Sequence, residues 1–141
     1  MRLITKDIHY ALKVLLYIVK DPLRITTVDE LAKKLNMRRA FLRGVLQSLA
    51  KKGILKSFKG NRGGFRLNIN PAKIHVIDVV TAFRKDEDIF SCLLDKDICP
   101  HLSDCVLMKE VIKANKGLNN ILKKITILKL FKSINGQVKE G

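Results

Sequence analysis

The chain has 141 residues, a length that fits one domain and leaves little room for a multidomain enzyme. Hydrophobic residues make up 47% and charged residues 29% of it, a composition that excludes disorder throughout. The net charge is +15, from 28 Lys and Arg against 13 Asp and Glu, so we expect a polyanionic partner. No apolar run reaches the roughly 18 residues of a membrane span, and no signal sequence is recognisable, so we expect a cytoplasmic protein.

The charge is distributed unevenly and divides the chain into three parts. Residues 1–85 carry 19 basic and 5 acidic side chains, residues 86–108 carry 1 and 6, and residues 109–141 carry 8 and 2. All three cysteines, Cys92, Cys99 and Cys105, lie in the acidic part. An odd number of thiols in a cytoplasmic protein argues against a disulfide framework and favours a metal or redox site.

The first part of the chain is predicted to contain a helix-turn-helix. Apolar residues spaced by three and four predict a helix over 8–19, which ends before a Pro. The sequence from Thr27 to Glu30 has the form of a capping box and predicts a short helix to about Leu35, with a turn at Asn36. A second amphipathic helix is predicted over 38–51, where one face is apolar.

A β-hairpin is predicted after this helix, because the apolar period changes beyond Gly53. Residues 54–58 and 65–69 read as short strands, and they flank a glycine-rich cationic segment at 59–64. A helix-turn-helix followed by such a hairpin is typical of a winged helix, in which the second helix enters the major groove of DNA. The hairpin tip then contacts an adjacent groove or the phosphates.

Two helices are predicted beyond the hairpin. Apolar residues over 76–83 indicate a short helix before the acidic part. A long helix follows, for which Ser103 is a candidate cap. Its apolar residues step by four and three in a heptad seam, which needs a partner helix: Leu107, Val111, Ala114, Leu118, Ile121 and Ile125. The predicted fold is mainly α with a small β-hairpin: a winged helix-turn-helix and a long C-terminal dimerisation helix.

The candidate DNA contacts lie on both of the elements that a winged helix presents to the duplex. Arg can bind guanine or phosphate from the start of a recognition helix, and glycines let the hairpin tip approach closely. The alternative is that these residues form a solvated surface on an ordinary helical domain. The predicted contacts are Arg38, Arg39, Arg43 and Gln47 on the helix and Lys59, Asn61 and Arg62 at the hairpin tip.

Several short motifs, together with the cysteines, resemble the Rrf-two family of bacterial winged-helix transcriptional regulators, which includes IscR, NsrR and RirA. The similarity covers about residues 1–132. It implies a homodimer that binds a double-stranded DNA operator under the control of an iron–sulfur cluster, 4Fe–4S or 2Fe–2S. The motifs are Tyr10-Ala-Leu12, Phe41-Leu42, Leu46-x-x-Leu49, Lys51-Lys-Gly-Ile54 and Ser57-x-Lys-Gly-x-x-Gly-Gly-Phe-x-Leu67.

The cysteine spacing suits a cluster better than one zinc ion. Six residues separate Cys92 from Cys99 and five separate Cys99 from Cys105, gaps longer than the knuckles of most structural zinc sites. Three thiolates leave one position on the iron open or weakly filled, where nitric oxide or oxygen can react. A zinc or thiol-redox site and three buried free cysteines are the alternatives.

The fourth cluster ligand is assigned from the resemblance. IscR-like members carry a His separated from the third cysteine by two residues, and here Met108 occupies that position. NsrR-like members use an acidic residue on the first helix that reaches the cluster of the other subunit, and here His9 occupies that position. An imidazole is a competent iron ligand. An ordinary surface histidine is the alternative for His9, and the reserve ligands are Asp7, His101 and Asp104.

The sequence thus predicts three regions: a DNA-binding domain over 1–85, a cysteine-bearing loop over 86–105, and a dimerisation helix with a basic tail over 106–141. The leading function is a transcriptional regulator, a repressor, controlled by a cluster that senses nitric oxide, redox or iron–sulfur status. The alternative is a cluster-free regulator of the same fold that responds to a metabolite or a partner protein. An enzyme is disfavoured because no nucleophile–base pair, phosphate loop or paired carboxylates are found.

Overall fold

The structure is a computed structural model in which residues 5–84 and 106–140 are described. The three cysteines, Ser103, His101 and Asp104 lie outside these residues. The described elements are α1 (Lys6–Ile18), α2 (Val28–Leu35), α3 (Arg39–Lys51), β1 (Leu55–Phe58), β2 (Gly64–Leu67), the 3₁₀ turn η1 (Pro71–Lys73), α4 (Val76–Phe83), α5 (Val106–Lys124) and α6 (Ile127–Glu140). The predicted mainly helical fold with a small antiparallel hairpin is confirmed.

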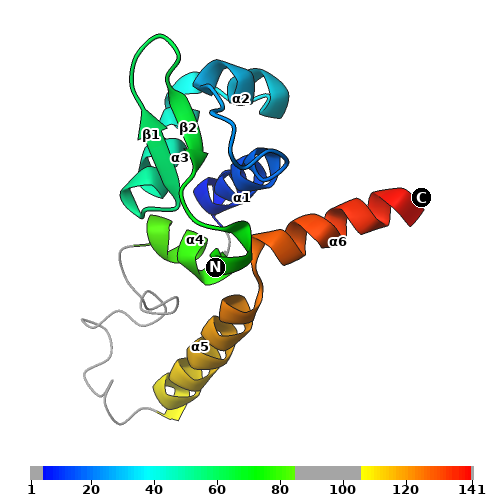
Figure 1. The fold of residues 1–141 in the computed structure, drawn as a ribbon. Helices are drawn as coiled ribbons and strands as arrows, with labels where there is room; N and C mark the ends of the chain where they lie inside the picture. The colour runs from blue at the N-terminus through cyan, green and yellow to red at the C-terminus, as the bar shows by residue number, and fades with distance from the viewer. Residues whose placement is uncertain (1–4, 85–105, 141) are drawn as a thin grey trace.

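The elements α1 to β2 form one end of the molecule, which we call the head. Helix α5 projects at the other end of the molecule, beyond α4 (Figure 1). One apolar core holds the head together, and α4 joins this core through Val76, Val79 and Val80. Burial of this apolar surface is the main stabilising contribution. None of the helices within the described residues is long and apolar enough to cross a membrane.

The two ends of α2 agree with the sequence prediction in part. The Thr27 hydroxyl accepts a hydrogen bond from the Glu30 backbone N–H at 3.1 Å, and Asn36 takes the left-handed conformation that ends α2 (φ 51°). The second half of the predicted capping box is wrong. The Glu30 carboxylate does not return to Thr27, because it accepts hydrogen bonds from the Tyr17 hydroxyl at 3.1 Å and from Arg24 at 2.7 Å.

This Tyr17–Glu30–Arg24 cluster ties α1 to α2. The hydrogen bond from Arg24 holds the pKa of the Glu30 carboxyl below its usual value. Burial, and next the hydrogen bond to Glu30, raise the pKa of the Tyr17 hydroxyl. Glu30 therefore stays ionised and keeps both partners in place at neutral pH.

A third extended segment lies beside the hairpin. Thr26 and Phe65 exchange two backbone hydrogen bonds, with N···O distances of 2.8 and 2.9 Å. Gly64, next to Phe65, is packed so tightly that a Cβ there would collide with the Thr26 carbonyl oxygen and lie 2.9 Å from its carbon. The close approach of the Thr26 segment thus requires glycine at position 64.

Gly64→Ala is expected to lower the free energy of unfolding by about 1–3 kcal/mol, because backbone atoms must move to admit the methyl group. Gly44→Ala is the matched control, since a Cβ at Gly44 meets nothing within 4 Å. That change should raise the free energy of unfolding by up to about 1 kcal/mol, because Ala is the better helix former. Urea denaturation at equal protein concentration measures both. Equal stability of the two variants would contradict this packing.

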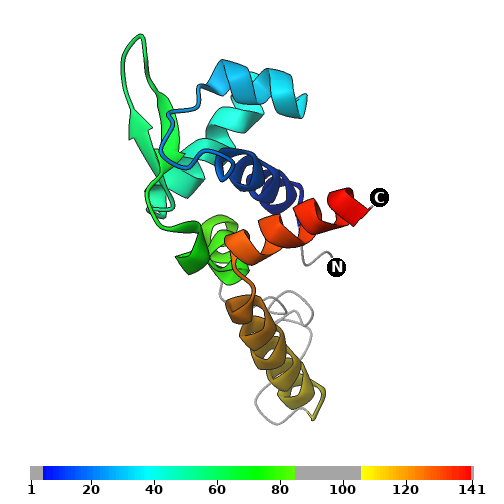
Figure 2. The ribbon, with the colours of Figure 1, turned by 45° about the vertical axis from the view of Figure 1, so that its right-hand side comes forward.

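The C-terminal region contains two helices where the sequence predicted one helix and a tail. Strand-like hydrogen bonds break the helix: the Val76 N–H donates to the Ile125 carbonyl at 2.9 Å, and the Ile127 N–H donates to the Ile74 carbonyl at 2.8 Å. The Thr126 hydroxyl then caps α6 by accepting from the Lys129 N–H at 3.1 Å. As a result α6 turns away from α5 and runs alongside α1 (Figure 2).

The predicted heptad seam, which runs along α5 to Ile125 just beyond its end, is divided between two surfaces. Val111, Leu118 and Ile125 are half-buried within the chain, and Ile125 packs against the core with Leu122. Leu107 and Ile121 stay 59% and 58% exposed. One part of the seam therefore stabilises the protomer, and the other part remains available to a partner.

Candidate nucleic-acid interface

The candidate recognition helix α3 is fixed by one apolar face and presents the other to solvent. Leu42, Val45, Leu46 and Leu49 are buried in the core. The outward face is exposed along the whole helix, from Arg39 to Lys51. Because α3 packs against α1, α2 and β1, its outward face is held rigidly relative to the hairpin.

All seven residues predicted to contact DNA are exposed. Arg38 is the N-cap residue of α3, and Arg43 and Gln47 are one helical turn apart on its outward face. Lys59, Asn61 and Arg62 lie in the loop between β1 and β2, at the hairpin tip in Figure 1. The structure thus places the predicted residues on the two elements of a winged helix that face a duplex.

Arg39 differs from the other cations of α3 because it has an intramolecular partner. Its guanidinium forms an ion pair with Asp29 of α2 at 3.0 Å, and the two side chains are 60% and 61% exposed. An exposed ion pair of this kind contributes at most about 1 kcal/mol, so a phosphate can compete for Arg39. Of the three predicted arginine contacts Arg38, Arg39 and Arg43, only Arg39 must therefore give up an ion pair to bind phosphate.

The outward face of α3 also contains two small residues that the sequence analysis overlooked. Ala40 and Gly44 are exposed between the predicted contact residues, and the position of a Gly44 Cβ faces open space. Small side chains let a helix backbone approach the edges of the bases closely. The helical spacing of 40, 43, 44 and 47 is the signal that groups them.

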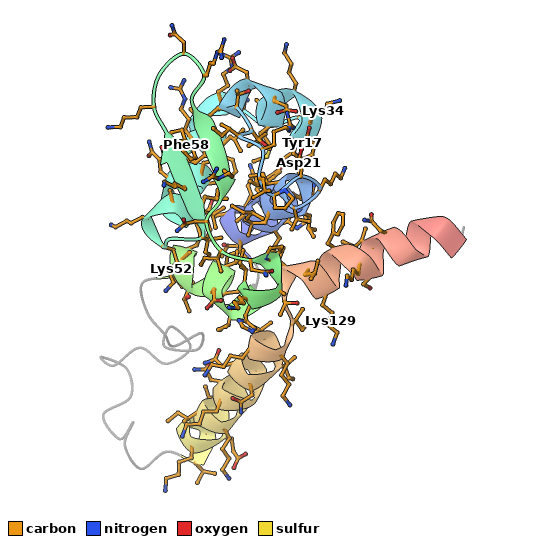
Figure 3. All side chains as sticks on the ribbon, viewed as in Figure 1. Tyr17, Asp21, Lys34, Lys52, Phe58 and Lys129 are labelled. Atoms are coloured by element: carbon orange, nitrogen blue, oxygen red, sulfur yellow. The ribbon has the colours of Figure 1, made fainter. Side chains whose placement is uncertain are left out.

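The outer surface of the hairpin carries a second group of cations that the sequence analysis overlooked. Lys56 lies directly opposite Arg66 across the two strands. The Lys56 Nζ is 5.6 Å and the Arg66 guanidinium carbon 5.0 Å from the centre of the Phe58 ring, which is labelled in Figure 3. Like charges directly opposite each other destabilise a sheet, so this pair would be stabilised by an anion placed between the two cations. Strand alternation, which puts Lys56 and Phe58 on one face, is the signal that predicts this group.

Two of the candidate cluster ligands, His9 and Asp7, lie within the described residues. His9 and Asp7 are exposed on α1, and the His9 ring contacts the edge of Tyr10 at a centroid distance of 5.8 Å. His75 is the N-cap of α4, in a capping box with Asp78, so its role is structural. Within residues 5–84 and 106–140, no three His, Cys, Asp or Glu side chains come together as a metal site.

Comparison with known proteins supports the arrangement. Residues 4–133 match the model of the family Rrf2 (Rrf-two), described as iron-dependent transcriptional regulator. An Aquifex aeolicus (strain VF5) protein, whose name places it among HTH-type transcriptional regulators, is 32% identical over 122 residues, 85% of each chain. The HTH-type transcriptional regulator NsrR of Bacillus subtilis (strain 168) is 25% identical over 132 residues, which are 92% of this chain and 90% of NsrR.

Two solved structures share the fold. CymR, the global cysteine regulator of B. subtilis, superimposes with a TM-score of 0.72 at 19% identity, over 94% of this chain and 98% of CymR. IscR of T. potens superimposes with a TM-score of 0.71 at 20% identity, over 92% of this chain and 86% of IscR. At this identity the likeness shows a common fold.

Proposed function

Because the chain belongs to the Rrf2 family of transcriptional regulators, we propose that it represses transcription in the cytoplasm by binding a DNA operator as a homodimer. The chain is a regulator and not an enzyme. The proposal adds three elements to that assignment: the DNA contacts, the dimer, and an iron–sulfur cluster that controls binding.

The main support for the proposed DNA contacts is that cations are exposed on both α3 and the hairpin tip, two elements of the same packed head. Arg38, Arg43 and Gln47 extend from α3 toward solvent, and Lys59 and Arg62 extend from the hairpin tip. In the proposed complex α3 enters the major groove, where Arg43 and Gln47 contact base edges. The hairpin cations, with Lys56 and Arg66 behind them, bind phosphates and provide the salt-dependent part of the affinity.

Selection of bound sequences from a random duplex library tests this function. A symmetric dimer reads a pseudo-palindrome whose half-sites are about one helical turn apart, or a multiple of that distance. One enriched pseudo-palindrome is therefore the expected result. Binding to all duplexes with equal affinity at about 150 mM salt would contradict operator recognition.

The proposed dimer forms through the exposed apolar side of α5. Leu107, Ala114 and Ile121 recur every seven residues and lie on one side of the helix, which the protomer leaves uncovered. An apolar strip on a projecting helix is stabilised when a second copy covers it. The half-buried residues Val111, Leu118 and Ile125 belong to the protomer, so the dimer contact uses only part of the predicted seam.

Ile121→Glu is expected to raise the dimer dissociation constant by at least about tenfold, because two carboxylates are then buried at the symmetric interface. Asn120→Glu, at the neighbouring exposed position, introduces the same charge on a different side of α5 and should leave the dimer intact. Sedimentation velocity over a range of micromolar concentrations distinguishes them. Two variants with equal dissociation constants would exclude this side of α5 as the interface.

For the cluster, we propose Cys92, Cys99 and Cys105 as thiolate ligands and His9 of the other subunit as the fourth. The donor set suits iron, and the description of the family as iron-dependent supports it. His9 fits the role because its imidazole is exposed and its ring contact within the described residues is with the edge of Tyr10. When bound, the cluster supplies an iron that reacts with nitric oxide or oxygen, whereas His9 links its state to the position of α1.

The alternative is a cluster-free regulator of the same fold that responds to a metabolite or a partner protein. Reconstitution with iron and sulfide under anaerobic conditions distinguishes the two. A visible charge-transfer absorption with stoichiometric iron and sulfide is the expected result. A colourless protein after reconstitution would leave the DNA-binding proposal intact and favour the alternative.

A further inference from the structure

A cavity of about 410 Å³ lies between the head and α6. Three helices form its walls, so it joins the DNA-binding head to the helix that follows α5. Figure 3 labels Tyr17 and Lys34 close together on the side of the head above α6. The lining residues are Lys13, Leu16, Tyr17 and Lys20 of α1 and the loop after it, Lys34 and Leu35 of α2, and Phe131, Ile134 and Asn135 of α6.

The charge of the cavity has one sign. Lys13, Lys20 and Lys34 contribute three ammonium groups, and no acidic side chain is among the lining residues. A second cavity of about 300 Å³ shares Tyr17, Lys20 and Lys34 and is also lined by Asp21, Arg24 and Thr26, so its lining has one carboxylate beside three cations. The nearby Glu30 carboxylate attracts the Lys34 ammonium group, but its hydrogen-bond partners are Arg24 and the Tyr17 hydroxyl, which bind its Oε1 atom.

The rest of the lining is apolar. Leu16, Tyr17, Leu35 and Phe131 pack partly against the core, and Ile134 is 43% exposed. A cavity of this volume falls within the range of about 300–1,000 Å³ that is usual for small-molecule sites. Apolar walls with a few convergent charges are also typical of such sites, where the charges orient the ligand.

We propose that this cavity binds a small organic anion: a carboxylate or phosphate head group held by Lys13, Lys20 and Lys34, with an aliphatic or aromatic body packed against Leu16 and Phe131. Of the seven residues proposed to contact DNA, none lines the cavity. The ligand site is thus separate from the nucleic-acid interface, and its occupation does not require DNA.

Binding here has a structural consequence for the head. Lys34 belongs to α2, the first helix of the helix-turn-helix, whereas Phe131 belongs to α6, which is joined to α5 through Thr126. A ligand that contacts both fixes the head relative to α5. In the proposed dimer, this sets the distance between the two recognition helices.

The test uses the full-length protein without DNA, so its outcome is independent of the proposed operator binding. The probe is 8-anilinonaphthalene-1-sulfonate, an anion with an apolar aromatic body whose fluorescence rises in apolar surroundings. The cationic aromatic dye thioflavin T is the matched probe of opposite charge. Saturable binding of the anion, and at least about tenfold weaker binding of the cation, is the expected result, because the three ammonium groups attract the first and repel the second.

Two variants locate the site. Lys34→Glu should raise the dissociation constant for the anionic probe about fivefold or more, whereas Lys33→Glu, the neighbouring exposed lysine of α2 outside the lining, should leave it unchanged. Ile134→Asn should weaken binding through the α6 wall. Equal effects of Lys34→Glu and Lys33→Glu would overturn the proposal. So would probe binding that Lys34→Glu and Ile134→Asn leave unchanged while Ile121→Glu alters it, since the dye would then report the dimer surface of α5.

Discussion

Arg43→Ala is expected to lower the affinity for the selected operator by about ten- to a hundredfold and to relax the sequence preference at one base pair of each half-site. The reason is geometric: Arg43 is exposed in α3 next to Gly44, which lets the helix approach the base edges, and its guanidinium can bind a guanine through two hydrogen bonds. Fluorescence anisotropy with the selected duplex and with single-base variants measures both effects.

Arg62→Ala provides the contrast on the hairpin. Because Arg62 lies at the exposed tip, we expect it to bind phosphate and its loss to weaken all duplexes alike, with a salt dependence reduced by about one counterion. Lys129→Ala is the control, since Lys129 is an exposed cation at the start of α6, away from the hairpin (Figure 3). If neither arginine change alters affinity or salt dependence, the winged-helix mode of binding is excluded.

Replacement of any one of Cys92, Cys99 and Cys105 by Ala is expected to abolish retention of the cluster and to leave the head folded. Two thiolates hold a cluster too weakly, and the buried core that the structure describes is formed by residues between 8 and 80 together with Ile127. Iron and sulfide analysis of anaerobically purified protein measures the first effect, and circular dichroism measures the second. Full iron content in any of the three variants would remove that cysteine from the ligand set.

His9→Ala is expected to keep the iron and to change its visible spectrum or its response to nitric oxide, because three thiolates remain. His101→Ala tests the competing assignment and should leave the spectrum and the response to nitric oxide unchanged. A His9 variant with spectrum, redox behaviour and DNA binding identical to the parent would exclude His9. Asp7, His101 or Asp104 would then be the candidates for the fourth ligand.

The parts of the fold that depend on local signals were predictable from the sequence. The apolar stripe of α3 predicted which of its residues are buried, and Thr27 and Asn36 mark the two ends of α2 as expected. Gly53, beyond which the apolar period of the sequence changes, has a φ of 84° just after the end of α3. In each case the determining residues are within a few positions of one another.

The parts that depend on contacts between distant segments were not predictable. The break at Thr126 requires the backbone of residues 74–76 to pair with that of 125–127, and nothing near Thr126 in the sequence indicates this. The diversion of Glu30 from its capping role requires Tyr17 and Arg24 to meet it. The cavity between α2 and α6 likewise exists only because α6 returns to the head.

The most direct test of the account is the affinity of anaerobically purified, iron-loaded protein for its selected duplex before and after stoichiometric nitric oxide. We expect iron and sulfide in the protein as isolated and a dissociation constant that rises at least about tenfold after nitric oxide, a change of about 1.4 kcal/mol. The Cys99→Ala protein should show no response. An operator affinity that is the same with the cluster intact, after nitric oxide and in Cys99→Ala would contradict control of DNA binding by a cluster.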